Sequence, residues 1–205
     1  MLASAKLQRA LMLVLAALLG AIVFIVVTNR SPGDTGQAAA FDGPTMPPHL
    51  LAHNFTLTDQ YGRRVSLSAD RGKVVVLTFI HSLCHDTCPF MVEQIKGALN
   101  DLPDNGRNIP TIGVSVAPGQ DTVHNRKAFL AKHEMTGRIA FVNGPLREMR
   151  QVWHDYAIEP VTPKVDHSTF VLLLDKHGYE RIGFAADQLT PEGLAHDIKA
   201  LERQS

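Results

Sequence analysis

The only two cysteines of the 205-residue chain, Cys84 and Cys88, lie four positions apart in FIHSLCHDTCPFM, and Pro89 follows them directly. A thiolate is both a nucleophile and a soft metal ligand, so the pair suits a structural disulfide, a redox couple or part of a metal site. A disulfide over this separation closes a very short loop and removes little entropy from the unfolded chain. A redox couple or a metal site is therefore the better interpretation.

The spacing of the pair narrows the chemistry further. Thioredoxin-type oxidoreductases use Cys-x-x-Cys, whereas this pair is Cys-x-x-x-Cys, and the Cys-x-x-Cys-His pattern of c-type haem attachment is absent. Two thiolates alone can hold Cu(I), and a site that also holds Cu(II) needs an imidazole nitrogen.

His167 is the histidine whose position best suits such a ligand. It directly precedes STFVLLLD, and in a thioredoxin-like sheet the loop entering this strand faces the cysteine loop. From position alone, a metal ligand and a structural histidine both remain open. His81 and His85 flank the cysteines and are candidate ligands, and His85, inside the loop, is equally suited to point outward. The other histidines lie among polar residues and are expected to face solvent: His49, His53, His124, His133, His154, His177 and His196.

The elements around the cysteines predict an α/β fold. Lys73–Ile80, KVVVLTFI, is typical of a central strand buried on both faces, and a helix is expected over Pro89–Leu102. The pair thus lies where ligands bind in open α/β sheets. A helix N-terminus also favours the thiolate and is expected to lower a thiol's pKa.

The remaining pattern alternates strands and helices. Residues 54–57 and 64–67 flank a hairpin turn in TDQYG. Further strands are expected at 109–116, 138–142, 168–175 and 179–185, and helices at 121–133, 145–156 and 190–203. This order predicts a central mixed β-sheet flanked by helices, the thioredoxin-like fold.

The N-terminal segment is predicted to be a membrane anchor. Residues 10–28 are uncharged and almost wholly apolar, and as a helix they would extend about 28 Å, close to the hydrocarbon thickness of a bilayer. Lys6 and Arg9 precede this span, which favours a cytoplasmic N-terminus. We therefore expect an uncleaved signal anchor over 1–30, with a cleaved signal peptide as the alternative. A flexible tether over 31–48 and one domain over 49–205 are expected to follow. The chain would be a single-pass protein of the inner membrane with its domain on the periplasmic side.

Charge argues against a nucleic-acid partner. Three of the twenty Lys and Arg residues lie in the first thirty positions, which leaves 17 basic against 20 acidic side chains in the rest. An acidic domain without a basic block is a poor binder of phosphate.

Several motifs together resemble the Sco (SenC) family of copper-binding assembly proteins over roughly Asn54–Leu201. They are FTLTDQYGRRVSL, GKVVVLTFIHSLCHDTCP, IGVSVAPGQDT and VDHSTFVLLLDKHG, after an N-terminal anchor. The resemblance implies a thioredoxin-like fold and one copper per chain, Cu(I) or Cu(II), held by Cys84, Cys88 and His167. It also implies delivery of copper to the dinuclear copper A centre in subunit II of cytochrome c oxidase, or maintenance of that centre's cysteines.

The resemblance also concerns residues around the site. Asp86 and Asp166 are expected to orient the ligands or tune their charge, although Asp86 is equally suited to cap the loop. His81 stands where the family usually has an aromatic residue or threonine, and it is a candidate extra ligand or proton acceptor. Ala117 replaces an aspartate that the family often carries, so another copper-accepting partner is also open.

Two functions from different classes follow. One is a metallochaperone that uses ligand exchange, and the other is a thiol–disulfide reductase that acts on cysteine pairs of exported proteins. A peroxiredoxin-like scaffold is a remote third alternative.

Overall fold

The computed structural model of the chain describes residues 41–161 and 170–204. The predicted anchor, Asp166 and His167 lie outside the described residues. Across the two described ranges, no helix combines the length and apolar character that crossing a membrane requires. From Phe41 onward the chain forms one compact unit.

The core of this unit is a five-stranded mixed sheet in the order β5-β4-β3-β6-β7. Its central strand, β3 (Val75–Ile80), pairs in parallel with β4 (Thr111–Ser115) and antiparallel with β6 (Phe170–Leu174). On the outer edges, β5 (Ala140–Val142) runs parallel to β4, and β7 (Glu180–Ala185) runs antiparallel to β6. The predicted mixed α/β sheet is confirmed.

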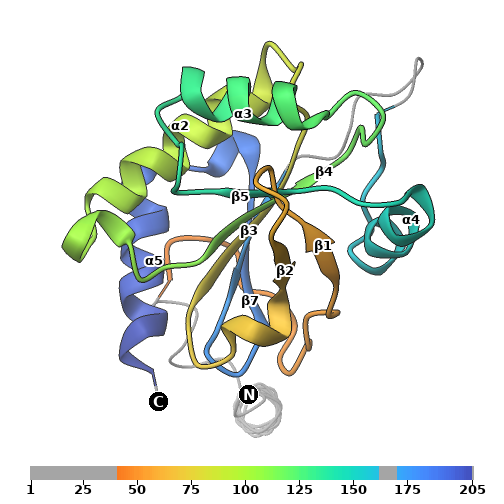
Figure 1. The fold of residues 1–205 in the computed structure, drawn as a ribbon. Coiled ribbons are helices and arrows are strands. Elements are labelled where there is room, and N and C mark those ends of the chain that lie inside the picture. The colour runs from red at the N-terminus through yellow and green to blue at the C-terminus, as the bar shows by residue number, and fades with distance from the viewer. Residues whose placement is uncertain (1–40, 162–169, 205) are drawn as a thin grey trace, which may run out of the picture. The chain divides into compact units, whose positions relative to one another are not determined.

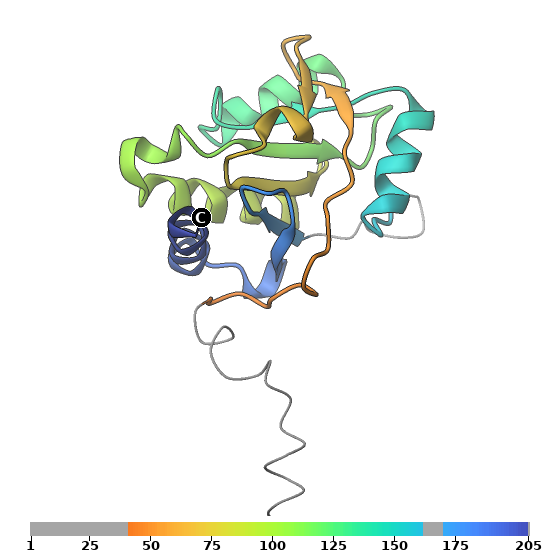
Figure 2. The ribbon, with the colours of Figure 1, turned by 90° about the horizontal axis from the view of Figure 1, so that it is seen from below.

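Helices cover both faces of the sheet because alternate residues of β3 point to opposite sides. One face packs against α2 (Thr87–Asn100), α3 (Val123–Lys132) and α5 (Pro191–Arg203), and α2 contacts α5 directly. The other face packs against α4 (Leu146–Asp155) and the hairpin of β1 (Thr56–Thr58) and β2 (Arg64–Ser66). Figures 1 and 2 show α4 and α5 on opposite sides of the sheet. Every residue of β3 is buried, as predicted for a strand covered on both faces.

The segment before the hairpin packs along β7. Phe41 is buried in the core, the Met46 N–H donates to the Arg181 carbonyl at 2.8 Å, and the Gly183 N–H donates to the Pro44 carbonyl at 3.0 Å. Residues 41–48 fall within the range predicted as a tether, so the packed part of the chain begins before His49. We call Phe41–Met46 the strap.

Side-chain caps set the start of two helices. Thr122 accepts a hydrogen bond from the Asn125 N–H at the start of α3, and Thr190 accepts one from the Gly193 N–H at the start of α5. Helix α2 starts at Thr87, two residues before its predicted start at Pro89, and therefore includes Cys88.

Candidate metal and thiol site

The cysteine pair lies between the end of β3 and the start of α2. The Cys84 N–H donates to the His81 carbonyl at 3.1 Å, which turns the chain after the strand. Cys88, the second residue of α2, is fully buried, whereas Cys84 is only partly buried against the same core. The His81 N–H donates to Cys88 Sγ at 3.4 Å, and the side chains of the two cysteines interact by a hydrogen bond. The structure thus brings the two sulfurs together at the carboxyl end of a central strand.

The helix N-terminus does not lower the pKa of Cys88, contrary to expectation. The hydrogen bond with Cys84 and burial raise the pKa of the Cys88 thiol far above its ordinary value, and the His81 N–H offsets only part of this rise. Nearby negative charge at Cys84 and Asp121 acts in the same direction as burial. The pair is therefore asymmetric, with a partly exposed Cys84 and a buried Cys88 that retains its proton.

A buried carboxylate, Asp121, fixes the cysteine loop, and sequence reasoning did not identify this role. Asp121 Oδ1 accepts hydrogen bonds from the Ser82 N–H at 2.7 Å and from Ser82 Oγ, while Oδ2 accepts from Ser115 Oγ. Asp121 is fully buried, and its backbone carbonyl accepts from Arg126 Nε at 3.1 Å. It therefore joins the loop after β3 to β4 and the start of α3. An aspartate directly before the capping Thr122 was the available signal, but a sequence does not reveal burial.

The other residues predicted near the site occupy different environments. Asp86 is the N-cap residue of α2, but its side chain accepts no capping hydrogen bond, so the capping interpretation is wrong. His85 is exposed, as expected. His81 is buried, and its Nε2 has no hydrogen-bond partner in the part of the chain that the structure describes.

The described residues do not form a preassembled three-ligand group around the two sulfurs. Within them, neither His81 nor any Asp or Glu joins both cysteines in a group of ligand atoms lying within 4.8 Å of one another. Asp42, His196 and Asp197 do form such a group. In it, the Asp197 carboxylate accepts hydrogen bonds from the backbone N–H groups of Asp42 and Gly43. These bonds give that group a structural role in holding the strap.

The described residues on both sides of 162–169 lie at the end of the sheet that carries the cysteine loop, which we call the cysteine edge. On one side, the Val161 N–H donates to the carbonyl of Val116, just after β4. On the other, Thr78 Oγ1 of β3 donates to the Phe170 carbonyl at 3.1 Å. His167 lies in the sequence between these two described ends.

His133 differs from its predicted exposure. It is buried beside α2, where its Nδ1 pairs with Glu93 Oε1 at 2.9 Å and its ring packs on Phe129. The remaining six of the histidines expected to face solvent are exposed.

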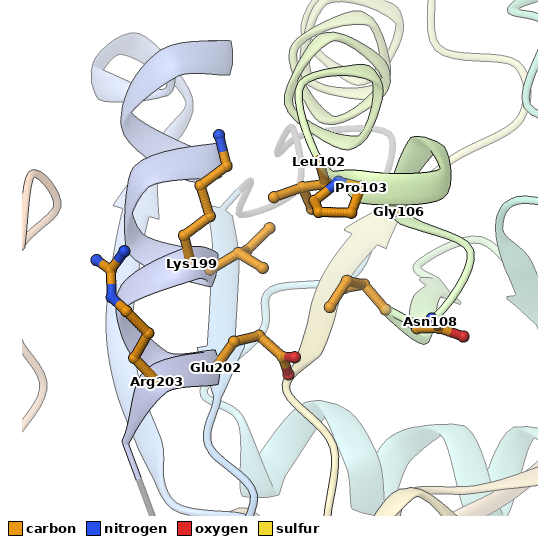
Figure 3. A pocket seen from close by; sticks show the side chains of 9 residues that line it. Leu102, Pro103, Gly106, Asn108, Lys199, Glu202 and Arg203 are labelled. Atoms are coloured by element: carbon orange, nitrogen blue, oxygen red, sulfur yellow. The ribbon is translucent and has the colours of Figure 1, made fainter.

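A separate pocket of about 260 Å³ lies between α5 and the turn after α2 (Figure 3). Apolar Leu102, Ile109 and Ile198 line it together with the charged residues Lys199, Glu202 and Arg203. It lies beyond the C-terminal end of α2, and the helix of 14 residues extends about 21 Å. The pocket is therefore not part of the cysteine site.

With the fold and the cysteine edge established, comparison with known proteins decides the family. The SCO1/SenC family model matches residues 44–203, which include both cysteines and most of the compact unit. The chain belongs to the SCO1/SenC family.

Individual Sco proteins are similar at modest identity. Protein sco1 of Schizosaccharomyces pombe is 26% identical over 160 residues, which cover 72% of this chain and 59% of that protein. The chain spans about half the length of the curated Sco relatives it matches.

Solved structures confirm the Sco fold. Bradyrhizobium japonicum ScoI, solved with copper bound, has a TM-score of 0.64 and 26% identity, and the match covers 74% of this chain and 99% of that chain. BsSco, described as a member of the Sco family of cytochrome c oxidase assembly proteins with a disulfide switch, has a TM-score of 0.67 and 22% identity over 79% of this chain and 99% of that chain.

Proposed function

We propose that this Sco-family chain is a membrane-anchored metallochaperone that binds one copper ion and delivers it to the copper A centre of cytochrome c oxidase subunit II. The observation that carries the proposal is the adjacency of two cysteine side chains on a rigid sheet edge. Two converging sulfurs suit Cu(I). The copper-bound ScoI relative and the family of oxidase assembly proteins support the choice of metal and target.

Copper binding requires Cys88 to lose the proton that its surroundings favour. The pKa of Cys88 is raised by its hydrogen bond with Cys84 and by burial, so the thiol is largely protonated at neutral pH. A bound cation replaces that proton, and metal uptake releases protons into solution. The buried His81 N–H remains directed at the sulfur and stabilises its negative charge.

We further propose that His167 supplies the imidazole that makes Cu(II) tolerable. Both described ends of its segment meet the cysteine edge, which supports this assignment. We assign to Asp166 and Asp86 an influence on ligand orientation and charge. An anchor near the N-terminus would hold the domain at the inner membrane, on the periplasmic side, and raise its effective concentration near a membrane-bound acceptor.

Separate titrations with Cu(I) and Cu(II) test this function in the reduced chain. Wild type should bind one equivalent of each ion, and Cys84→Ala or Cys88→Ala should abolish thiolate-to-Cu(II) charge-transfer absorption. His167→Ala should weaken Cu(II) at least tenfold and Cu(I) much less, because thiolates satisfy Cu(I). His124→Ala, on the exposed start of α3, is the matched control. Equal Cu(II) affinity in the His167→Ala and wild-type chains would refute the three-ligand site.

The asymmetry of the pair favours a second function, a thiol–disulfide reductase. The Cys84 thiolate would attack a partner disulfide and release one partner thiolate. Cys88 would then lose its proton and attack Cys84 Sγ, releasing the second thiolate and leaving a Cys84–Cys88 disulfide. Cys88→Ser should trap the mixed disulfide, whereas Cys84→Ser should form none; equal trapping by both variants would contradict these roles.

A further inference from the structure

An open hollow of about 500 Å³ lies beside the cysteine loop. The start of α2 forms one side, and the short helix η4 (Ala186–Gln188) with the end of β7 forms the other. Its lining consists of Asp86, Thr87, Phe90, Ala185, Ala186 and Asp187. Because Asp86 is two residues from each cysteine, anything held here lies next to the reacting sulfurs. We call this feature the acidic hollow.

The two carboxylates of the acidic hollow make no stabilising contact with the described residues. Asp86 and Asp187 are exposed, and within residues 41–161 and 170–204 neither side chain makes a hydrogen bond or ion pair. An aspartate at a helix N-cap ordinarily accepts a bond from the helix, and Asp86 does not. None of the described residues that line the hollow is Lys or Arg, so its lining supplies no positive charge to balance the two carboxylates.

The apolar part of the acidic hollow is an exposed aromatic ring. Phe90, in the first turn of α2, retains 46% of its accessible surface, although Cys88 and Met91 beside it are fully buried. Leu83, in the cysteine loop, is 44% exposed. Exposed apolar side chains around a partly exposed reactive group are typical of a protein-binding surface.

One chemical group matches both parts of the acidic hollow. A guanidinium is planar, stacks on an aromatic face and donates paired hydrogen bonds to carboxylates. An ammonium group supplies the charge without the paired geometry, and an apolar side chain would leave the carboxylates unused.

We propose that the acidic hollow binds an arginine side chain of the protein that exchanges copper or a disulfide with Cys84 and Cys88. The identity of the partner rests on the proposed function, whereas the choice of an arginine side chain rests on Asp86, Asp187 and Phe90. Docking of the arginine would orient the partner's sulfur atoms over the partly exposed Cys84.

The test uses the full chain with Cys84→Ser and Cys88→Ser, so that neither metal nor disulfide chemistry contributes. Three fluorescent dodecapeptides, identical except for a central Arg, Gln or Glu, are titrated by anisotropy at low and high salt. We expect the Arg peptide to bind about tenfold more tightly than the Gln peptide and the Glu peptide to bind least. Raising the salt concentration should reduce this preference.

Substitutions in the chain then test whether the preference for the Arg peptide arises at the acidic hollow. Asp86→Asn with Asp187→Asn should remove the Arg preference, and Phe90→Ala should weaken the Arg peptide by severalfold. Asn is also a good N-cap residue, so α2 should keep its start. Asp101→Asn, which neutralises an exposed carboxylate just beyond the other end of α2, is the matched control and should change nothing. Equal binding of Arg and Gln peptides, an effect of Asp101→Asn as large as that of the double variant, or sensitivity to Phe90→Ala alone would overturn the proposal.

Copper titration separates this inference from the proposed function. With the cysteines intact, the Asp86→Asn, Asp187→Asn chain should still bind one copper. If wild type binds no copper but the Arg preference follows the two aspartates, the metallochaperone proposal fails and arginine docking stands. If copper binds stoichiometrically without any Arg preference, the inference about the acidic hollow fails alone.

Discussion

At the residue scale, environment gives identical side chains different chemistry. Cys84 and Cys88 differ in burial and in their hydrogen bonds, and only Cys88 receives the His81 N–H. One cysteine is thereby available to a partner while the other is protected inside α2. Such a division suits both ligand exchange, in which one sulfur must be approached first, and a resolving role for the buried thiol.

Glu180 provides the pH prediction at this scale. It is 6% exposed at the start of β7, and burial raises the pKa of its carboxyl group, with His53 offsetting part of the rise. The folded state therefore binds more protons than the unfolded state, and stability falls as pH rises above the ordinary glutamate value. Glu180→Gln should raise the free energy of unfolding at pH 7 by roughly 1 kcal/mol and flatten this decline.

Urea unfolding from pH 4 to pH 8 checks the prediction, with the exposed Glu202→Gln as control. A Glu180→Gln curve that keeps the wild-type slope would show that this carboxyl group does not cause the decline.

At the element scale, Asp121 connects segments that the sequence order separates. It accepts hydrogen bonds from Ser82, after β3, and from Ser115, at the end of β4. The cysteine loop is thereby attached to the end of β4 through a buried carboxylate. This attachment fixes where Cys84 begins its turn.

Removing that carboxylate should loosen the loop. Asp121→Ala leaves the Ser82 N–H and two hydroxyls without their buried acceptor, at an expected cost of about 3 kcal/mol in unfolding free energy. A double-mutant cycle with Ser82→Ala should give a coupling energy above about 1 kcal/mol, measured by urea unfolding. Additive effects would mean that Asp121 acts elsewhere, through Ser115 or α3.

Regular patterns predicted the elements, and tertiary contacts explain the differences. The apolar run before the cysteines predicted β3, and the Pro-led segment predicted α2. Pro89 stands at the third position of that helix. Proline has no N–H group, and this is tolerated there because the first four N–H groups of a helix have no intrahelical acceptor. The burial of Asp121 and His133 depends on Ser82 and Glu93, which are 39 and 40 residues away, so no local pattern contains it.

At the scale of the whole molecule, the strap sets where the compact unit begins. Asp197, fully buried in α5, accepts the Asp42 N–H at 2.7 Å and the Gly43 N–H at 2.8 Å. Thr45 pairs with Ile182 of β7. The Gly- and Pro-rich composition of this segment predicted a tether. Its packing was not predicted, because backbone pairing with a distant strand leaves no periodic pattern in the sequence.

Asp197→Ala should release the strap. Losing the acceptor of two backbone N–H groups should cost about 2 kcal/mol in unfolding free energy and open the segment to proteases. Limited proteolysis followed by mass spectrometry should find new cleavage between Phe41 and His49. The exposed Asp187→Ala serves as control, and unchanged cleavage in Asp197→Ala would show that β7 holds the strap without α5.

The pairing of β3 with β6 has a kinetic consequence. Thr78 of the central strand pairs with Val171, more than ninety residues later, so the middle of the sheet forms only after most of the domain has been synthesised. Contacts between such distant residues form slowly. Until they form, Cys88 lacks its finished burial and is as open to oxidation as Cys84. The interval before β6 pairs with β3 is therefore the one in which both thiols are most open to oxidation.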